Sequence, residues 1–248
     1  MAGVGLARRA LAEGVGTGLL VVAVVGSGIM AARLSPGNVG LELLENSIAT
    51  AFALAALILA FGPVSGAHFN PAVSLADWWL GRRHRTGLST PVLGVYVAAQ
   101  VAGGIGGSVL ANLMFGLPAV RFSTTTRAAG HLWLGEVVAT AGLLLLIFAL
   151  ARTGRTAAAP AAVGAYIGAA YWFTSSTSFA NPAVTIGRAF TDTFAGIAPG
   201  SVPGFVAAQL VGLVVGVGLL AALYPDAGRA ADNVVTAHGP AVDVDGRP

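Results

Sequence analysis

The sequence predicts an all-α integral membrane protein with six transmembrane helices and two short re-entrant half-helices, arranged as an inverted repeat of three plus three spans. Three observations predict this fold class. Long apolar stretches carry no charged residue, three segments of the first half recur in the second, and each half contains one Asn-Pro-Ala motif.

The composition excludes an ordinary soluble domain. Of the 248 residues, 56% are hydrophobic and 9% are charged, whereas a soluble domain carries about a quarter charged residues. A soluble helical core would need a charged surface that this chain lacks. A transmembrane helix needs roughly 20 mostly apolar residues. Asp, Glu, Lys and Arg are absent from residues 14–32, 46–64, 86–120, 137–151, 156–187 and 193–225.

The first apolar run is interpreted as a transmembrane helix rather than a cleavable signal. It follows Arg8 and Arg9 and continues to Ala32, beyond the length of a signal-peptide core. The chain has no cysteine, which excludes disulfides and thiol chemistry. No HExxH or GxSxG motif occurs, and the four histidines are scattered. We therefore expect no enzyme activity, no cofactor and no metal site.

The chain is a duplicated unit. Three blocks recur in the same order: Leu11–Leu20 as Leu134–Leu143, Asn70–Asp77 as Asn181–Arg188, and Val95–Gly104 as Gly204–Leu213. A chance match in Ala/Val-rich sequence could explain one block but hardly all three. We expect a single domain over residues 1–225, with halves of about 6–121 and 131–225. Residues 226–248 are polar and are predicted to be a disordered cytoplasmic tail.

Each half contains three predicted spans. They lie near Glu13–Ala32, Asn46–Gly62, Pro91–Asn112, Leu132–Ala151, Pro160–Thr174 and Ser201–Tyr224. Because three is odd, the second half must enter the bilayer from the opposite side. The repeat is therefore inverted, a design that places a binding site near the midplane between the halves.

The arginines predict the orientation. With both termini in the cytoplasm, nine arginines fall inside and four fall outside, as the positive-inside rule requires. The inner set is Arg8, Arg9, Arg82, Arg83, Arg85, Arg152, Arg155, Arg229 and Arg247, and the outer set is Arg33, Arg121, Arg127 and Arg188.

An Asn-Pro-Ala motif begins a short helical pattern in each half. Asparagine is a favoured helix cap, and proline fits the first helical turn without losing a hydrogen bond. In an inverted repeat the two half-helices would meet end to end near the midplane, with their electropositive N-termini facing each other. The motif residues are Asn70, Pro71, Ala72, Asn181, Pro182 and Ala183.

The segments before the motifs, Val64–Phe69 and Ser175–Ala180, are predicted to be extended. Carbonyls left unpaired at membrane depth are tolerated only where they line a wet cavity. We therefore expect a pore in which these carbonyls accept hydrogen bonds and the Asn70 and Asn181 amides donate them.

Two such motifs in an inverted membrane repeat resemble the aquaporin and aquaglyceroporin (major intrinsic protein) family, over roughly Leu6–Leu223. The resemblance implies a passive channel in the plasma membrane for small neutral solutes and water, usually a homotetramer. The sequence NPAVTIGRAFTDTFAGIAP, starting at Asn181, is similar to bacterial aquaglyceroporins associated with arsenic resistance. It adds arsenite and other neutral metalloid acids to glycerol as candidate solutes.

The resemblance also implies supporting residues. Glu13 and Glu136 occupy matching positions, and such glutamates hold the re-entrant loops, whereas the alternative is proton coupling. His68 lies in the first loop, where support is expected rather than metal binding.

In this family, four positions form a narrow selectivity filter at the outer end of the pore. By spacing from the motifs, they fall at Thr50, Ala169, Ser178 and Val184. The family pattern places arginine where this chain has Val184, so a wide constriction with two hydroxyls and no fixed charge is expected. Arg188 lies one turn further on. It either overhangs the outer vestibule or forms a surface pair with Asp192 at i+4.

Alternative functions stay open at this point. One is a water-selective pore, and another is a coupled secondary transporter, which can also be built from inverted repeats with broken helices. A non-conducting member of the same family is a third.

Overall fold

The computed structural model describes residues 4–82, 84 and 86–225. This part of the chain is helical and contains no strand. The helices are α1 (Leu6–Leu34), α2 (Val39–Ser65), α3 (Pro71–Gly81), α4 (Thr90–Met114), α5 (Gly130–Arg152), α6 (Ala159–Phe173), α7 (Pro182–Gly187) and α8 (Val202–Leu223). Three short 3₁₀ turns are η1 (Thr156–Ala158), η2 (Arg188–Phe190) and η3 (Pro199–Ser201).

Six long helices and two short ones confirm the predicted fold class. Five of the long helices are sufficiently long and apolar to cross a membrane. The sixth, α6, has 15 residues and is directly preceded by η1, so helical backbone covers residues 156–173. The helices α1 and α2 begin seven residues before the predicted spans at Glu13 and Asn46. Glu13 and Glu45 set the predicted starts of these two spans, but the helical backbone begins before both residues and includes them.

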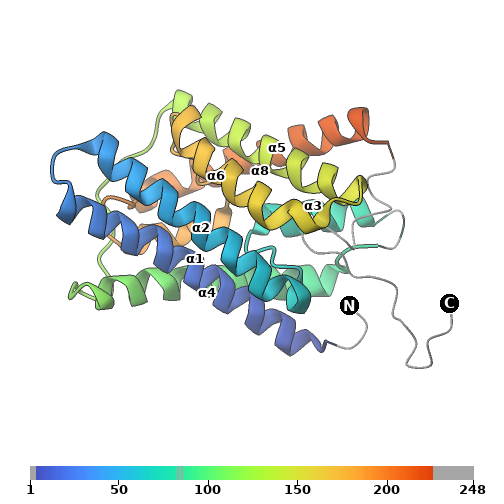
Figure 1. The fold of residues 1–248 in the computed structure, drawn as a ribbon, viewed down its shortest axis with the longest axis horizontal. Helices are drawn as coiled ribbons and strands as arrows, with labels where there is room; N and C mark the ends of the chain where they lie inside the picture. Colours follow the sequence, from blue (N-terminus) through green and yellow to red (C-terminus); the bar gives the residue numbers. More distant parts are fainter. Residues whose placement is uncertain (1–3, 83, 85, 226–248) are drawn as a thin grey trace.

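The two halves pack in the same way. Helix α1 packs along α4 in the first half, and α5 packs along α8 in the second. Contacts of α1 with α2 and of α2 with α6 complete the bundle. The long helices run along the same direction in Figure 1, with the half-helix α3 beside them. Both half-helices, α3 and α7, contact α4 and α8.

Glycine allows the second half-helix to approach α4 at backbone distance. A Cβ atom built on Gly104 would lie 2.7 Å from the carbonyl oxygen of Ala183. The facing residue on the half-helix is Gly187, whose own Cβ would collide with the Gly104 carbonyl. Close contact of small residues drives helix association in membranes, where lipid is as apolar as leucine.

The outer surface of the bundle is apolar. Phe52, Leu59 and Leu134 expose between 63% and 73% of their area. Such a surface would promote association of a soluble protein, but it matches the hydrocarbon of a bilayer.

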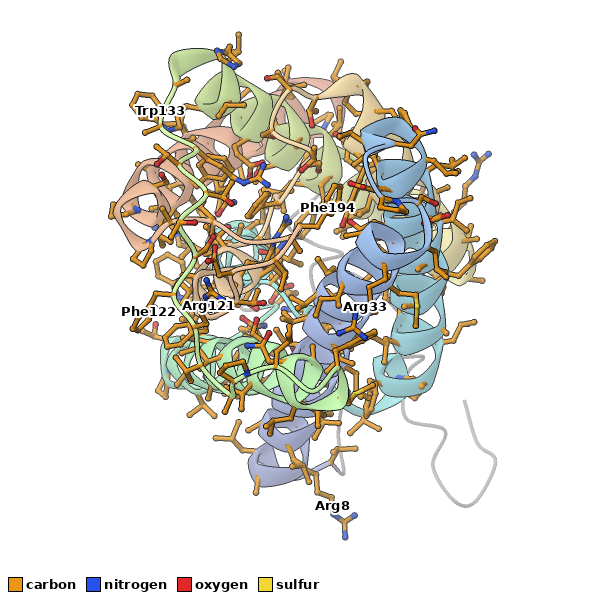
Figure 2. The ribbon with its side chains drawn as sticks, turned by 90° about the vertical axis from the view of Figure 1, so that its left-hand side faces the viewer. Arg8, Arg33, Arg121, Phe122, Trp133 and Phe194 are labelled. Carbon is orange, nitrogen blue, oxygen red and sulfur yellow. The ribbon has the colours of Figure 1, made fainter. Side chains whose placement is uncertain are left out.

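The two ends of the bundle differ. Helix α1 begins and α8 ends at the same end (Figure 1). Figure 2 views the opposite end, where the segment between α4 and α5 carries Arg121 and Phe122 across the bundle. The predicted tail at residues 226–248 lies outside the described residues, as do Arg83, Arg85, Arg229 and Arg247.

Candidate functional site

Two re-entrant segments connect the second long helix of each half to its half-helix. Ala67 and Phe69 in the first segment have φ of 47° and 50°. Thr177, Ser178 and Ala180 in the second have φ between 47° and 61°. The predicted extended segments are therefore wrong in detail: Val64 and Ser65 still belong to α2, and left-handed residues interrupt the remainder. Such a backbone costs about 1–3 kcal/mol per residue and must be held by its surroundings.

Glu13 holds the first segment. Its carboxylate, fully buried in α1, accepts hydrogen bonds from the backbone N–H groups of His68 (3.0 Å) and Phe69 (2.7 Å). It also accepts from the Ser65 hydroxyl at 2.6 Å and from the Gln100 amide at 2.8 Å. Since every partner donates, both oxygens act as acceptors, as in an ionised carboxylate.

Glu136 holds the second segment in the matching way. Its carboxylate accepts from the backbone N–H groups of Phe179 and Ala180, both at 2.8 Å. The Gln209 amide donates to it at 2.6 Å. Glu13 thus accepts four hydrogen bonds and Glu136 three, and in each case two come from the re-entrant backbone and one from a helix glutamine.

The two Asn-Pro-Ala motifs meet and bond to each other. Asn70 Oδ1 accepts from Ala72 N at 2.9 Å and caps α3, while its Nδ2 donates to the Ala180 carbonyl at 2.7 Å. Asn181 Oδ1 accepts from Ala183 N at 3.0 Å, and its Nδ2 donates to the Phe69 carbonyl at 2.7 Å. Each side-chain amide has two N–H bonds. The reciprocal hydrogen bonds use one of them, so each asparagine has a second N–H that they do not use.

An internal cavity of about 60 Å³ passes beside this junction. A water needs roughly 10–15 Å³ of such volume, so the cavity has room for about four to six. Both asparagines and residues 67–69 and 178–180 of the re-entrant segments line it. The other wall is apolar and consists of Leu20, Val24, Leu54, Ile58, Leu143, Ile147, Val163 and Ile167.

Three of the four predicted filter residues line this cavity. Thr50, Ser178 and Val184 do so, but Ala169 lies on the exposed face of α6. Tyr171 takes the inward position, and its hydroxyl lies 3.2 Å from Thr50 Oγ1. The prediction of Ala169 is wrong because no motif fixes the register of α6. The inward spacing Val163, Ile167, Tyr171 repeats every four residues, as Thr50, Leu54, Ile58 do on α2, and this signal could have found Tyr171.

The structure also corrects the expected absence of charge. Arg188 is 3% exposed and lines the cavity, so the surface pair with Asp192 does not form. Asp192 instead contacts Arg121 at 3.3 Å. Hydrogen bonds from the Thr124 backbone N–H and hydroxyl, with the Arg121 charge, hold the pKa of the Asp192 carboxyl below its usual value.

His68 lines the cavity at the first re-entrant segment. Its Nδ1 lies 3.0 Å from Ser74 Oγ, and its ring packs edge-on against Tyr96, with centroids 5.6 Å apart. The described residues contain no group of three or more His, Cys, Asp or Glu that could hold a metal ion.

This geometry defines a class: a membrane protein whose inverted halves each place a re-entrant Asn-Pro-Ala segment beside an internal cavity. The chain belongs to the major intrinsic protein family, whose family model matches residues 1–180. It is 53% identical to the aquaglyceroporin AqpS of Rhizobium meliloti (strain 1021) over 215 residues, which are 87% of this chain and 89% of that protein.

A second relative and one solved structure extend the comparison. The chain is 30% identical to the probable aquaporin AqpM of Archaeoglobus fulgidus over 223 residues, 77% of this chain and 86% of that protein. The crystal structure of the aquaglyceroporin from Plasmodium falciparum superposes with a TM-score of 0.65 at 21% identity, covering 89% of this chain and 98% of that one. This likeness shows the fold.

Replacing Glu136→Gln tests the role of the glutamates. The amide keeps one acceptor but turns an N–H group toward donors, which leaves a buried donor unpaired. We expect the variant to lose about 2–3 kcal/mol of stability, measured as a lower midpoint of thermal unfolding in detergent.

The matched control is Glu45→Gln, because Glu45 accepts a single hydrogen bond, from the Ser35 hydroxyl. This control should unfold like the wild type. A Glu136→Gln variant as stable as this control would contradict the assignment of Glu136 to the loop.

Proposed function

We propose that the chain is a passive transmembrane channel for small uncharged solutes, mainly glycerol-like polyols and water. The observation that carries the proposal is the cavity with one apolar wall and one hydrogen-bonding wall, which meet at the Asn70–Asn181 junction. The aquaglyceroporin name of the relative from Rhizobium meliloti, 53% identical, supports the same class of solute.

The two walls suit a molecule with hydroxyls on one side and carbon on the other. Within the described part of the chain, the carbonyls of Ala67, Ser178 and Phe179 have no recorded donor, and all three residues line the cavity. A polyol could donate to such carbonyls, accept from the free N–H groups of Asn70 and Asn181, and place its C–H groups against the leucines and isoleucines. These groups replace the hydrogen bonds that the solute made with water, and no charge has to be neutralised because the solute is uncharged.

Coupling to an ion gradient is not favoured by these contacts. No Asp or Glu is among the described residues that line the cavity. Glu13 and Glu136 lie behind the re-entrant segments, where three or four donors occupy each carboxylate. Proton relays in transporters use Asp, Glu or His side chains that exchange protons with the pathway. The titratable His68 ring that lines the cavity contacts Ser74 and Tyr96.

Neutral metalloid acids follow as secondary candidates. Arsenite at neutral pH is an uncharged triol, and a pore that fits one neutral triol should fit another. No residue that lines the cavity has a thiol, since the chain contains no cysteine. We therefore propose passage of arsenite by size and hydrogen bonding rather than by specific arsenic binding.

We further propose a homotetramer in the plasma membrane with both termini in the cytoplasm. Support for assembly comes from the apolar outer surface, where small residues such as Gly164 and Gly168 leave a shallow groove between α2 and α6. Native mass spectrometry in detergent should give four times the chain mass of 24.6 kDa; a single-chain mass would contradict this assembly.

Stopped-flow light scattering on proteoliposomes tests the channel. After a hypertonic glycerol step, we expect rapid shrinkage and then rapid reswelling, both faster than in empty liposomes. Fast shrinkage with reswelling at the control rate would show a water-selective pore. Neither phase faster than the control would show that the protein does not conduct.

The variant Thr50→Phe tests the constriction. A phenyl ring beside Tyr171 would fill the space between α2 and α6, so we expect glycerol reswelling to slow at least tenfold while water passes more readily than glycerol. Its matched control is Ala169→Phe, because Ala169 lies on the exposed face of the helix that carries Tyr171. Equal glycerol rates for the two variants would contradict the assigned filter.

Orientation can be measured with single cysteines, because the chain has none. Arg8 and Thr126 are both exposed and lie at the two ends of the bundle. A membrane-impermeant maleimide should label Thr126→Cys in intact cells and Arg8→Cys only in inverted vesicles. The reverse pattern would invert the proposed topology.

A further inference from the structure

We propose that the Phe194 ring narrows the entrance to the cavity one helical turn beyond the filter, and so limits the width of the polyol that can pass. This entrance is at the end of the bundle that Figure 2 views, where the proposed topology places the cell exterior. The inference rests on the proposed channel function and assigns to it a further residue that determines substrate size.

Helices α1 and α2 extend the cavity wall toward this entrance. Val24 on α1 and Thr50 on α2 line the cavity. Gly28 and Asn46 lie four residues further toward the same end, since α1 ends and α2 begins there. Four residues correspond to about 6 Å along a helix and to nearly the same face. The Asn46 amide also donates to the Val24 carbonyl at 2.8 Å, so Gly28 and Asn46 form one continuous wall beyond the filter.

Phe194 reaches this wall from the other half of the chain. It lies between η2 and η3, in the segment that follows the second half-helix. A Cβ atom built on Gly28 would lie 3.3 Å from Phe194 Cδ1 and 3.6 Å from Asn46 Nδ2, so the ring packs beside both residues. Figure 2 shows Phe194 between that segment and α1. The side chain is half-buried, so part of the ring remains open to the entrance that it crosses.

The turn that carries Phe194 is attached to the cavity wall. The N–H of Gly196 donates to the Thr193 carbonyl at 2.9 Å and closes the turn. The carbonyl of Ala195, the residue after Phe194, accepts a hydrogen bond from Nε of Arg188, which lines the cavity. These two hydrogen bonds hold the turn at the mouth of the cavity. The ring is therefore a fixed narrowing of the entrance rather than a mobile lid.

A narrowing of this kind selects by width. Selectivity in a pore depends on its diameter and on the hydrogen-bonding groups that line it. The Phe194 ring is apolar and uncharged, so it reduces the diameter without favouring one hydroxyl compound over another by hydrogen bonding. A slender polyol such as glycerol should pass the ring, whereas a branched polyol with the same hydroxyl chemistry should be held back.

Glycerol and pentaerythritol provide the test, because both carry hydroxymethyl groups but pentaerythritol is branched on all sides of one carbon. The flux of each is measured in proteoliposomes by reswelling. In Phe194→Ala the ratio of pentaerythritol to glycerol flux should rise about tenfold over the wild-type ratio. The matched control is Phe122→Ala, which removes a 57% exposed ring at the same end of the bundle and should keep the wild-type ratio.

Added bulk at the same position should have the opposite effect. The chain has no cysteine, so Phe194→Cys and Phe122→Cys each offer one thiol to a bulky maleimide, applied in detergent before reconstitution. Labelling should slow glycerol flux through Phe194→Cys about fivefold or more and leave Phe122→Cys unchanged. The same preparation is measured with and without label, so the comparison does not depend on how far the substitution alters stability.

The outcomes separate this inference from the function it rests on. A wild type impermeable to glycerol overturns the channel and the inference with it. A wild type that conducts glycerol, together with a Phe194→Ala variant that keeps the wild-type flux ratio, overturns the inference alone. If Phe194→Ala does not assemble, the labelled cysteine decides: glycerol flux that is unchanged in fully labelled Phe194→Cys overturns the inference.

Discussion

The reciprocal hydrogen bonds between the two asparagines and the two re-entrant backbones are the interaction on which this structure depends. Asn70 donates to the carbonyl of Ala180, and Asn181 donates to that of Phe69, each at 2.7 Å. Each amide oxygen meanwhile caps its own half-helix. One side chain therefore positions a helix end and joins it to the other half of the chain. If one half-helix moved, it would break a buried hydrogen bond to the re-entrant backbone that precedes the other half-helix.

This junction requires positive φ angles, which residues other than glycine rarely adopt. Five residues other than glycine adopt positive φ around it. Glu13 and Glu136 offset that cost by binding the N–H groups of these segments, and Gln100 and Gln209 connect the glutamates to the last long helix of each half. Charged groups are expensive in a membrane and are kept where they have full sets of partners. The paired carboxylates thus serve the loops.

Much of this site could be predicted from the sequence, because the repeated blocks identify residues that occupy equivalent positions in the two halves. The matching blocks place Glu13 with Glu136 and Asn70 with Asn181. Spacing from the motifs also located Thr50, Ser178 and Val184 beside the cavity. Ala169 failed because a uniformly apolar helix such as α6 offers no periodicity to fix its register. Arg188 was left undecided because the i+4 pairing with Asp192 assumes a continuous helix. The helix α7 ends at Gly187, and the following chain folds back to bring the Ala195 carbonyl to Arg188.

The most direct test of passive transport is the steady-state distribution of labelled glycerol in proteoliposomes with an imposed proton or sodium gradient. A pore whose carboxylates are committed to its loops cannot couple to either gradient. The internal glycerol concentration should therefore settle at the external value, whichever gradient is present and whatever its direction. Accumulation above the external concentration that collapses with an ionophore would contradict the channel and show a coupled transporter.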